Sequence, residues 1–130
     1  MTEQSQDKNP VGWFEIYVED LDRAARFYES VFQVKISEMP NAPNGVQMRA
    51  FPMNMGGMGA SGALVKMDGF PAGANSVLVY FMTDDCAVAA KRATSAGGKI
   101  VKEKMSIGDY GWIALASDTE GNMFGMHSMK

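Results

Sequence analysis

The stretch GWFEIYVEDLDRAARFYESVF, residues 12–32, decides the fold. Its first half alternates in the manner of a strand. One face holds a carboxylate between two aromatic side chains, namely Trp13, Glu15 and Tyr17. The other face is wholly apolar and consists of Phe14, Ile16 and Val18. Asp20 is a good N-cap residue, and apolar residues recur at helical spacing from Leu21 to Phe32. The stretch therefore predicts a strand followed by an amphipathic helix that packs on the apolar face of the strand.

The same pattern occurs again at a constant offset of 65 residues. WFEIYVEDLDRAARFYES (13–30) aligns with LVYFMTDDCAVAAKRATS (78–95), so that Asp85 falls on Asp20. The second helix has an apolar stripe that includes Cys86 and Ala90, and Gly97 and Gly98 end it. A repeat of this length indicates two copies of one supersecondary unit.

Further strand candidates follow each helix, separated by turn sequences rich in Gly, Pro and Asn. They are residues 34–39, 46–53 and 62–68, then 99–104, 111–117 and 122–128. The chain is thus predicted to be α+β, built from two tandem βαβββ modules. We expect residues 1–9 to be a disordered lead-in and residues 10–130 to form a single domain. Within that domain, the first module covers about 10–68 and the second covers 76–130, and residues 69–75 link them.

Composition excludes several classes of protein. The chain has 130 residues, one cysteine, a net charge of -3 and a pI near 5.1. One cysteine excludes an internal disulfide, and the lack of clustered basic residues argues against nucleic acid as a partner. We see no apolar run long enough to span a membrane and no signal-peptide pattern, so the expected location is the cytoplasm.

The repeat resembles the vicinal oxygen chelate superfamily, which includes glyoxalase I, bleomycin-resistance proteins and extradiol dioxygenases. The resemblance rests on VEDLDRAARFYESVF (18–32), AGGKI (96–100) and SDTEGNMFGM (117–126), and it covers nearly the whole chain. It implies the glyoxalase/bleomycin-resistance fold, in which the curved mixed sheets of the two modules surround a shared cleft. This fold hosts many chemistries, so the resemblance specifies activity weakly.

The resemblance also locates the metal ligands of metal-dependent relatives. Carried over by position, they fall on Trp13, about Ala63, Leu78 and about Gly125. None of these side chains binds a divalent cation in the usual way, whereas a catalytic metal site needs about three His, Cys, Asp or Glu donors. We therefore expect no metal and no other cofactor, and do not expect an active lactoylglutathione lyase.

If Trp13 faces the cleft, strand alternation brings other side chains to the same surface. The candidate ligand-binding residues are Trp13, Glu15, Tyr17, Leu78, Tyr80, Met82, Met123 and His127. Glu15 and His127 are also catalytic candidates, because a carboxylate and an imidazole that converge can transfer protons. Met53, Met55 and Met58 form a possible lip that closes over an apolar ligand.

Three functions follow from these observations. The leading prediction is a metal-independent protein that binds and sequesters a small, partly apolar molecule, as a homodimer in the manner of bleomycin-resistance relatives. The second is a glyoxalase-related enzyme, of lyase or isomerase type, that uses non-standard metal donors or Glu15 and His127 as acid and base. The third is a scaffold whose cleft is filled by its own side chains, which inward-facing Trp13 and Tyr17 favour.

Overall fold

A computed structural model describes residues 9–73 and 76–130 of the chain. The predicted lead-in therefore lies outside the described residues, except for residue 9, and the predicted linker at 69–75 lies partly outside them. No helix among the described residues is long and apolar enough to cross a membrane.

Each half of the chain folds as a βαβββ module. The first contains β1 (Val11–Tyr17), α2 (Leu21–Phe32), β2 (Ser37–Glu38), β3 (Val46–Ala50) and β4 (Ser61–Met67). The second contains β5 (Val77–Met82), α3 (Cys86–Ser95), β6 (Lys99–Ser106), the short 3-10 helix η1 (Gly108–Tyr110), β7 (Trp112–Ser117) and β8 (Met123–Ser128). The predicted α+β class and the tandem modules are confirmed.

The helix starts agree with the capping prediction. The side chain of Asp20 accepts a hydrogen bond from the backbone N–H of Arg23 at 3.0 Å, and that of Asp85 accepts one from Ala87 at 2.9 Å. Each cap satisfies one of the N–H groups that have no partner inside the helix. The two repeats therefore begin their helices with the same residue in the same role.

The two modules join edge to edge within the chain. All eight strands form one sheet in the order β2-β3-β4-β1-β5-β8-β7-β6. Strands β1 and β5 pair antiparallel at its centre, with Trp13 opposite Tyr80 and Glu15 opposite Leu78. The two halves of the order mirror each other about this central pair. The strands with the most informative sequences are therefore also the most central ones.

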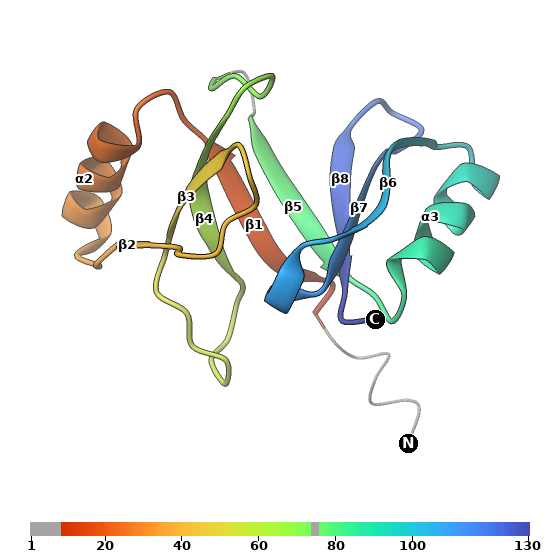
Figure 1. Ribbon diagram of the computed structural model, residues 1–130, viewed down its shortest axis with the longest axis horizontal. Helices are drawn as coiled ribbons and strands as arrows, with labels where there is room; N and C mark the ends of the chain where they lie inside the picture. Colours follow the sequence, from red (N-terminus) through yellow and green to blue (C-terminus); the bar gives the residue numbers. More distant parts are fainter. Residues whose placement is uncertain (1–8, 74–75) are drawn as a thin grey trace.

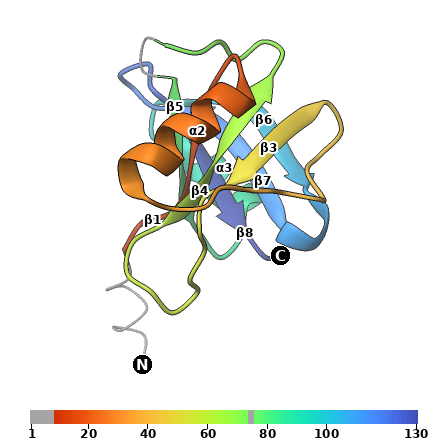
Figure 2. The same ribbon diagram turned by 90° about the vertical axis from the view of Figure 1, so that its left-hand side faces the viewer.

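Both helices lie on one side of the curved sheet, at opposite ends of the molecule (Figure 1; Figure 2 turns the view by 90°). Helix α2 packs through Leu21 and Ala25 against Leu64 of β4, and α3 packs through Cys86 and Ala90 against β7 and β8. The other side of the sheet carries a third apolar cluster, to which both modules contribute. We call this side the concave face.

The predicted strand ends need correction in the first module. The candidate at 34–39 is reduced to the two residues of β2, and the candidate at 46–53 ends at Ala50. Helix α2 ends at Gln33 in a left-handed conformation with φ 53°, so the chain must first turn back before it can pair. Pro52 has no backbone N–H to donate, which is consistent with β3 ending before it.

Candidate functional site

Glu15 lies at the centre of the concave face. It is in the middle of β1, opposite Ala63 of β4 on one side and Leu78 of β5 on the other. Only 8% of the residue is exposed. Strand alternation explains the placement, since Glu15 shares its face with Tyr17 and Trp13, while Ile16 packs toward helix α2.

Neutral hydrogen-bond donors surround the Glu15 carboxylate. The hydroxyl of Tyr17 donates to Oε1 at 2.7 Å, and the indole Nε1–H of Trp13 donates to Oε2 at 3.2 Å. The ion pairs recorded over residues 9–73 and 76–130 involve Asp20, Asp22 and Asp85, and none involves Glu15. This carboxylate is therefore buried with hydrogen bonds but without a cation.

Burial changes the ionisation of this group. Desolvation raises the pKa of Glu15 above 4.5, and hydrogen bonds from Tyr17, Trp13 and Tyr80 oppose that rise. Desolvation together with the nearby carboxylate raises the pKa of Tyr17 and the pKa of Tyr80 far above their ordinary value. Both phenols are consequently neutral donors at physiological pH.

Tyr80 is the counterpart of Glu15 in the second repeat, and it packs beside the same group. It lies opposite Trp13 of β1 and Gly125 of β8 and is 6% exposed. A Cβ atom added at Gly125 would overlap the Tyr80 ring. The ring therefore occupies the space that a side chain at position 125 would need.

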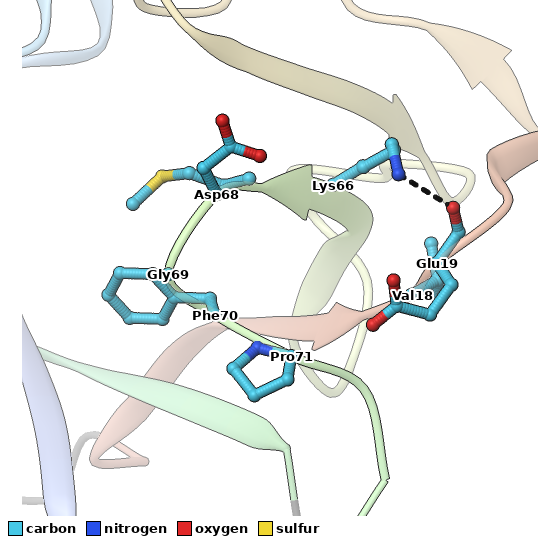
Figure 3. Close-up of a pocket in the computed structure, with 8 residues that line it drawn as sticks. Val18, Glu19, Lys66, Asp68, Gly69, Phe70 and Pro71 are labelled. Carbon is cyan, nitrogen blue, oxygen red and sulfur yellow. Dashed lines mark hydrogen bonds between the residues drawn. The ribbon is translucent and has the colours of Figure 1, made fainter.

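A turn of the first module covers part of the concave face. Phe70 stacks on Tyr17 with ring centroids 5.1 Å apart and an interplanar angle of 24°. Phe70 belongs to the segment that follows β4, where Gly69 adopts φ 90°. Figure 3 shows this turn beside Val18 and Glu19, with the amine of Lys66 donating to the backbone carbonyl of Glu19 at 2.8 Å.

Two hollows lie near the carboxyl end of β1. One, of about 320 Å³, lies between Val18 and the turn that ends at Pro71. Another, of about 450 Å³, lies between the start of α2 and Val77. Neither is lined by Glu15 or Tyr80. Phe70 and other partly buried side chains pack against the apolar cluster of this face.

The remaining predicted site residues divide into two groups. Leu78 and Met123 belong to the apolar cluster of the concave face, and Leu78 is 3% exposed. Met82, in contrast, is 48% exposed and lies opposite His127 at the other end of β5. The Nε2 atom of His127 is hydrogen-bonded to the backbone carbonyl of Tyr110.

The structure does not bring Glu15 and His127 together. Glu15 is opposite Leu78, whereas His127 is opposite Met82, four residues further along β5, and β8 does not adjoin β1. At about 3.3 Å per residue this register difference alone corresponds to roughly 13 Å. A single water cannot bridge that separation, so the hypothesis of acid–base catalysis by this pair fails.

The positions that the resemblance assigns to metal ligands do not fit a metal centre. Trp13 donates its indole N–H to Glu15, Ala63 and Leu78 offer only hydrocarbon, and the Tyr80 ring covers Gly125. Among the described residues no group of three or more His, Cys, Asp or Glu side chains is placed to hold a metal ion.

Strand alternation alone could not indicate Phe70. Its sequence context, DGFPAGAN at 68–75, has the Gly and Pro content of a linker. Nothing in that composition says that the connection folds back over the sheet. An isolated aromatic residue between turn residues was the only available signal.

Comparison with known proteins identifies the family. The model of the Glyoxalase/Bleomycin resistance protein/Dioxygenase superfamily matches residues 11–126. The chain belongs to this superfamily, and the resemblance found in its repeats is confirmed. Proteins named "Putative glyoxylase CFP32" from Mycobacterium bovis and Mycobacterium tuberculosis are 32% identical over 114 residues. That match covers 86% of this chain but only 41% of those proteins, so the chain spans less than half of their length.

Solved structures support the same fold. Methylmalonyl-CoA epimerase from Mycobacterium tuberculosis is similar with a TM-score of 0.68 and 18% identity, over 93% of this chain and 88% of that one. A hypothetical protein from Bacillus halodurans is similar with a TM-score of 0.66 and 10% identity, over 92% and 94% of the two chains. At these identities the likeness establishes the architecture alone.

Proposed function

We propose that this chain is a metal-independent binding protein for a small, partly apolar molecule, which it holds at Glu15 on the concave face. The observation that carries the proposal is a buried carboxylate whose hydrogen-bond donors, over residues 9–73 and 76–130, are all neutral. Burying a charge without an opposite charge is costly, and such groups concentrate at functional sites. A ligand with a positive or hydrogen-bond-donating group would supply what the carboxylate lacks.

The surroundings of Glu15 define the rest of the ligand. The neighbouring side chains are apolar or aromatic and include Leu78, Val65 and Tyr80. A site with apolar walls and few polar anchors is typical for small organic molecules. We therefore expect a ligand with an aromatic or aliphatic body and one cationic group.

The route to Glu15 passes the turn that carries Phe70. Because the Phe70 ring stacks on Tyr17, a ligand must displace that ring or take its place on the phenol. Gly69 has positive φ, and the hollow of about 320 Å³ beside the turn provides space into which it can shift.

The experiment is a binding screen with matched compounds. Three sets share one aromatic body and differ in a cationic, neutral or anionic group, and binding is measured as a shift in thermal unfolding. We expect the cationic set to stabilise the protein and Glu15→Gln to remove the effect. Glu103→Gln, an exposed change on β6, is the matched control. Equal effects of all three sets, or an unchanged response of Glu15→Gln, would overturn the proposal.

An enzyme is the second candidate, and the raised pKa of Glu15 favours it. A carboxylate with a raised pKa is a better general base, and neutral Tyr17 is adjacent as a donor. Since structural neighbours include methylmalonyl-CoA epimerases, proton abstraction beside a thioester carbonyl is the reaction to test. Deuterium exchange into acyl-CoA compounds that disappears in Glu15→Gln would favour the enzyme over a binding protein.

The third candidate, a scaffold with a filled cleft, is favoured by the stacking of Phe70 on Tyr17. In that case no set of compounds would bind, and Phe70→Ala would only lower stability. A binding protein instead gains affinity from Phe70→Ala, because the ligand no longer competes with the ring. The homodimer also remains a proposal, which sedimentation at several protein concentrations tests directly.

A further inference from the structure

Three methionines are gathered on the loop between β3 and β4, which we call the methionine loop (residues 52–61). Met53, Met55 and Met58 are 52%, 91% and 100% exposed. Methionine is normally a flexible filler of apolar cores, as Met126 is in this chain at 3% exposure. The three loop methionines cannot be explained by packing of the chain on itself.

The ends and the turn of the loop are held by hydrogen bonds. The backbone N–H of Phe51 donates to Gly62 at 2.9 Å, and the hydroxyl of Ser61 donates to the carbonyl of Pro52 at 3.0 Å. Within the loop, the N–H of Gly57 donates to the carbonyl of Asn54 at 2.9 Å. Residues 54–57 thus form a turn, with Met53 before it, Met58 after it and Met55 within it. Figure 1 shows the loop as the connection between β3 and β4.

The side chains of this loop carry no charge. Residues 51–62, FPMNMGGMGASG, contain no Asp, Glu, His, Cys, Lys or Arg. The side chains therefore offer three thioether sulfurs and no charge, while the oxygens of Asn54 and Ser61 are engaged in hydrogen bonds within the loop. Thioethers are soft ligands that favour Cu(I), whereas Mg²⁺, Ca²⁺ and Mn²⁺ favour carboxylate and carbonyl oxygens. A neutral set whose side-chain oxygens already take part in hydrogen bonds also gives little attraction to divalent ions.

We propose that the methionine loop binds one soft monovalent cation, Cu(I) or its analogue Ag(I), through the sulfur atoms of Met53, Met55 and Met58. Met53 and Met58 flank the turn at residues 54–57, and methionine has three rotatable bonds with which to bring its sulfur toward a bound ion. Gly56, Gly57 and Gly59 add little steric resistance to this closure. The inference is independent of the proposed function, because the loop contains none of the residues around Glu15.

The experiment uses Ag(I), which does not change oxidation state, and the methyl signals of the twelve methionines in ¹H–¹³C spectra of the full chain. We expect the three loop methyl signals to shift together and to saturate at one equivalent. Competition with a chromogenic Cu(I) chelator then gives the affinity for Cu(I) under reducing conditions. The double variant Met55→Leu/Met58→Leu should have an affinity for Cu(I) at least tenfold lower than that of the unchanged protein.

The matched control is Met129→Leu, because Met129 is 65% exposed but lies outside the loop. It should bind Cu(I) as tightly as the unchanged protein. Leucine at exposed loop positions also changes stability little, so a loss of binding can be read without loss of folding. The proposal would be overturned if the methyl signal of Met129 shifted as much as those of the loop, or if Cu(I) binding survived the double variant. It would also be overturned if Cys86 alone retained the metal ion.

Discussion

The hydroxyl of Tyr17 donates to Oε1 of Glu15 at 2.7 Å, from two residues further along the same face of β1. Trp13, two residues before Glu15, donates to the other carboxylate oxygen. One short segment thus provides both the buried charge and two of its donors. Three consecutive residues of one strand face form this hydrogen-bonded group.

Tyr17→Phe should destabilise the protein at pH 7. The change leaves the ring stacked on Phe70 but removes a donor to a buried carboxylate, and hydrogen bonds to charged groups contribute about 2 kcal/mol. Urea unfolding measures the loss. In the Glu15→Gln background the same change should cost about 1 kcal/mol or less, because the partner is then neutral. Equal losses in the two backgrounds would show that the hydrogen bond to the charge is not responsible.

Glu15→Gln should change how stability depends on pH. Because burial raises the pKa of Glu15 in the folded state, the folded protein binds this proton more tightly than the unfolded chain. The contribution of Glu15 to stability is therefore fully present below the unfolded pKa near 4.5 and is lost as pH rises through the folded pKa. The unfolding free energy of the variant, compared with that of the unchanged protein, should therefore be relatively higher at pH 8 than at pH 4. A gain that is the same at both pH values would contradict the raised pKa.

Gly125→Ala should be strongly destabilising for its size. The added methyl group would overlap the ring of Tyr80, and overpacking in a well-packed core costs about 2 kcal/mol. Gly56→Ala is the control, since its nearest neighbour would be an Asn54 oxygen at 4.0 Å. Thermal or urea unfolding should show the Gly125→Ala penalty shrinking in a Tyr80→Leu background. A penalty that Tyr80→Leu leaves unchanged would mean that another contact is responsible.

Substitutions at Asp85 should separate helix capping from ion pairing. Its carboxylate accepts from the N–H of Ala87 and from the amine of Lys104, both through Oδ1, at 2.9 Å and 3.0 Å. Asp85→Asn keeps a capping oxygen, whereas Asp85→Ala loses both partners, so Asp85→Ala should lower the melting temperature more. The hydrogen bond from Lys104 lowers the pKa of Asp85 below 3.8, so its charge contributes stability that is lost as pH falls through that pKa. The difference in melting temperature between Asp85→Asn and the unchanged protein should therefore become smaller at acidic pH.

The order of elements could be predicted from the sequence because the repeat gives the same signals twice. Asp20 and Asp85 cap the two helices, and the alternation around Glu15 places the aromatic residues and the carboxylate on one face. What could not be predicted depends on contacts between distant segments. The stacking of Phe70 on Tyr17 joins a connection to a strand, and the overlap of Tyr80 with position 125 joins two strands whose register no local pattern specifies. The distance between Glu15 and His127 could not be predicted for the same reason. Strand alternation indicates which face of the sheet a side chain occupies, but not how two strands are aligned along their length.

The measurement that tests the central claim most directly is an NMR titration observed at the two indole N–H signals of the chain. Trp13 donates to Glu15, while Trp112 lies on β7 under the amine of Lys104 at 5.0 Å from its ring centroid. The account predicts that a cationic aromatic compound shifts the Trp13 signal, leaves the Trp112 signal in place, and loses its effect in Glu15→Gln but not in Glu103→Gln. A compound that binds while the Trp13 signal stays still, or that shifts it equally in Glu15→Gln, would contradict a ligand site at Glu15.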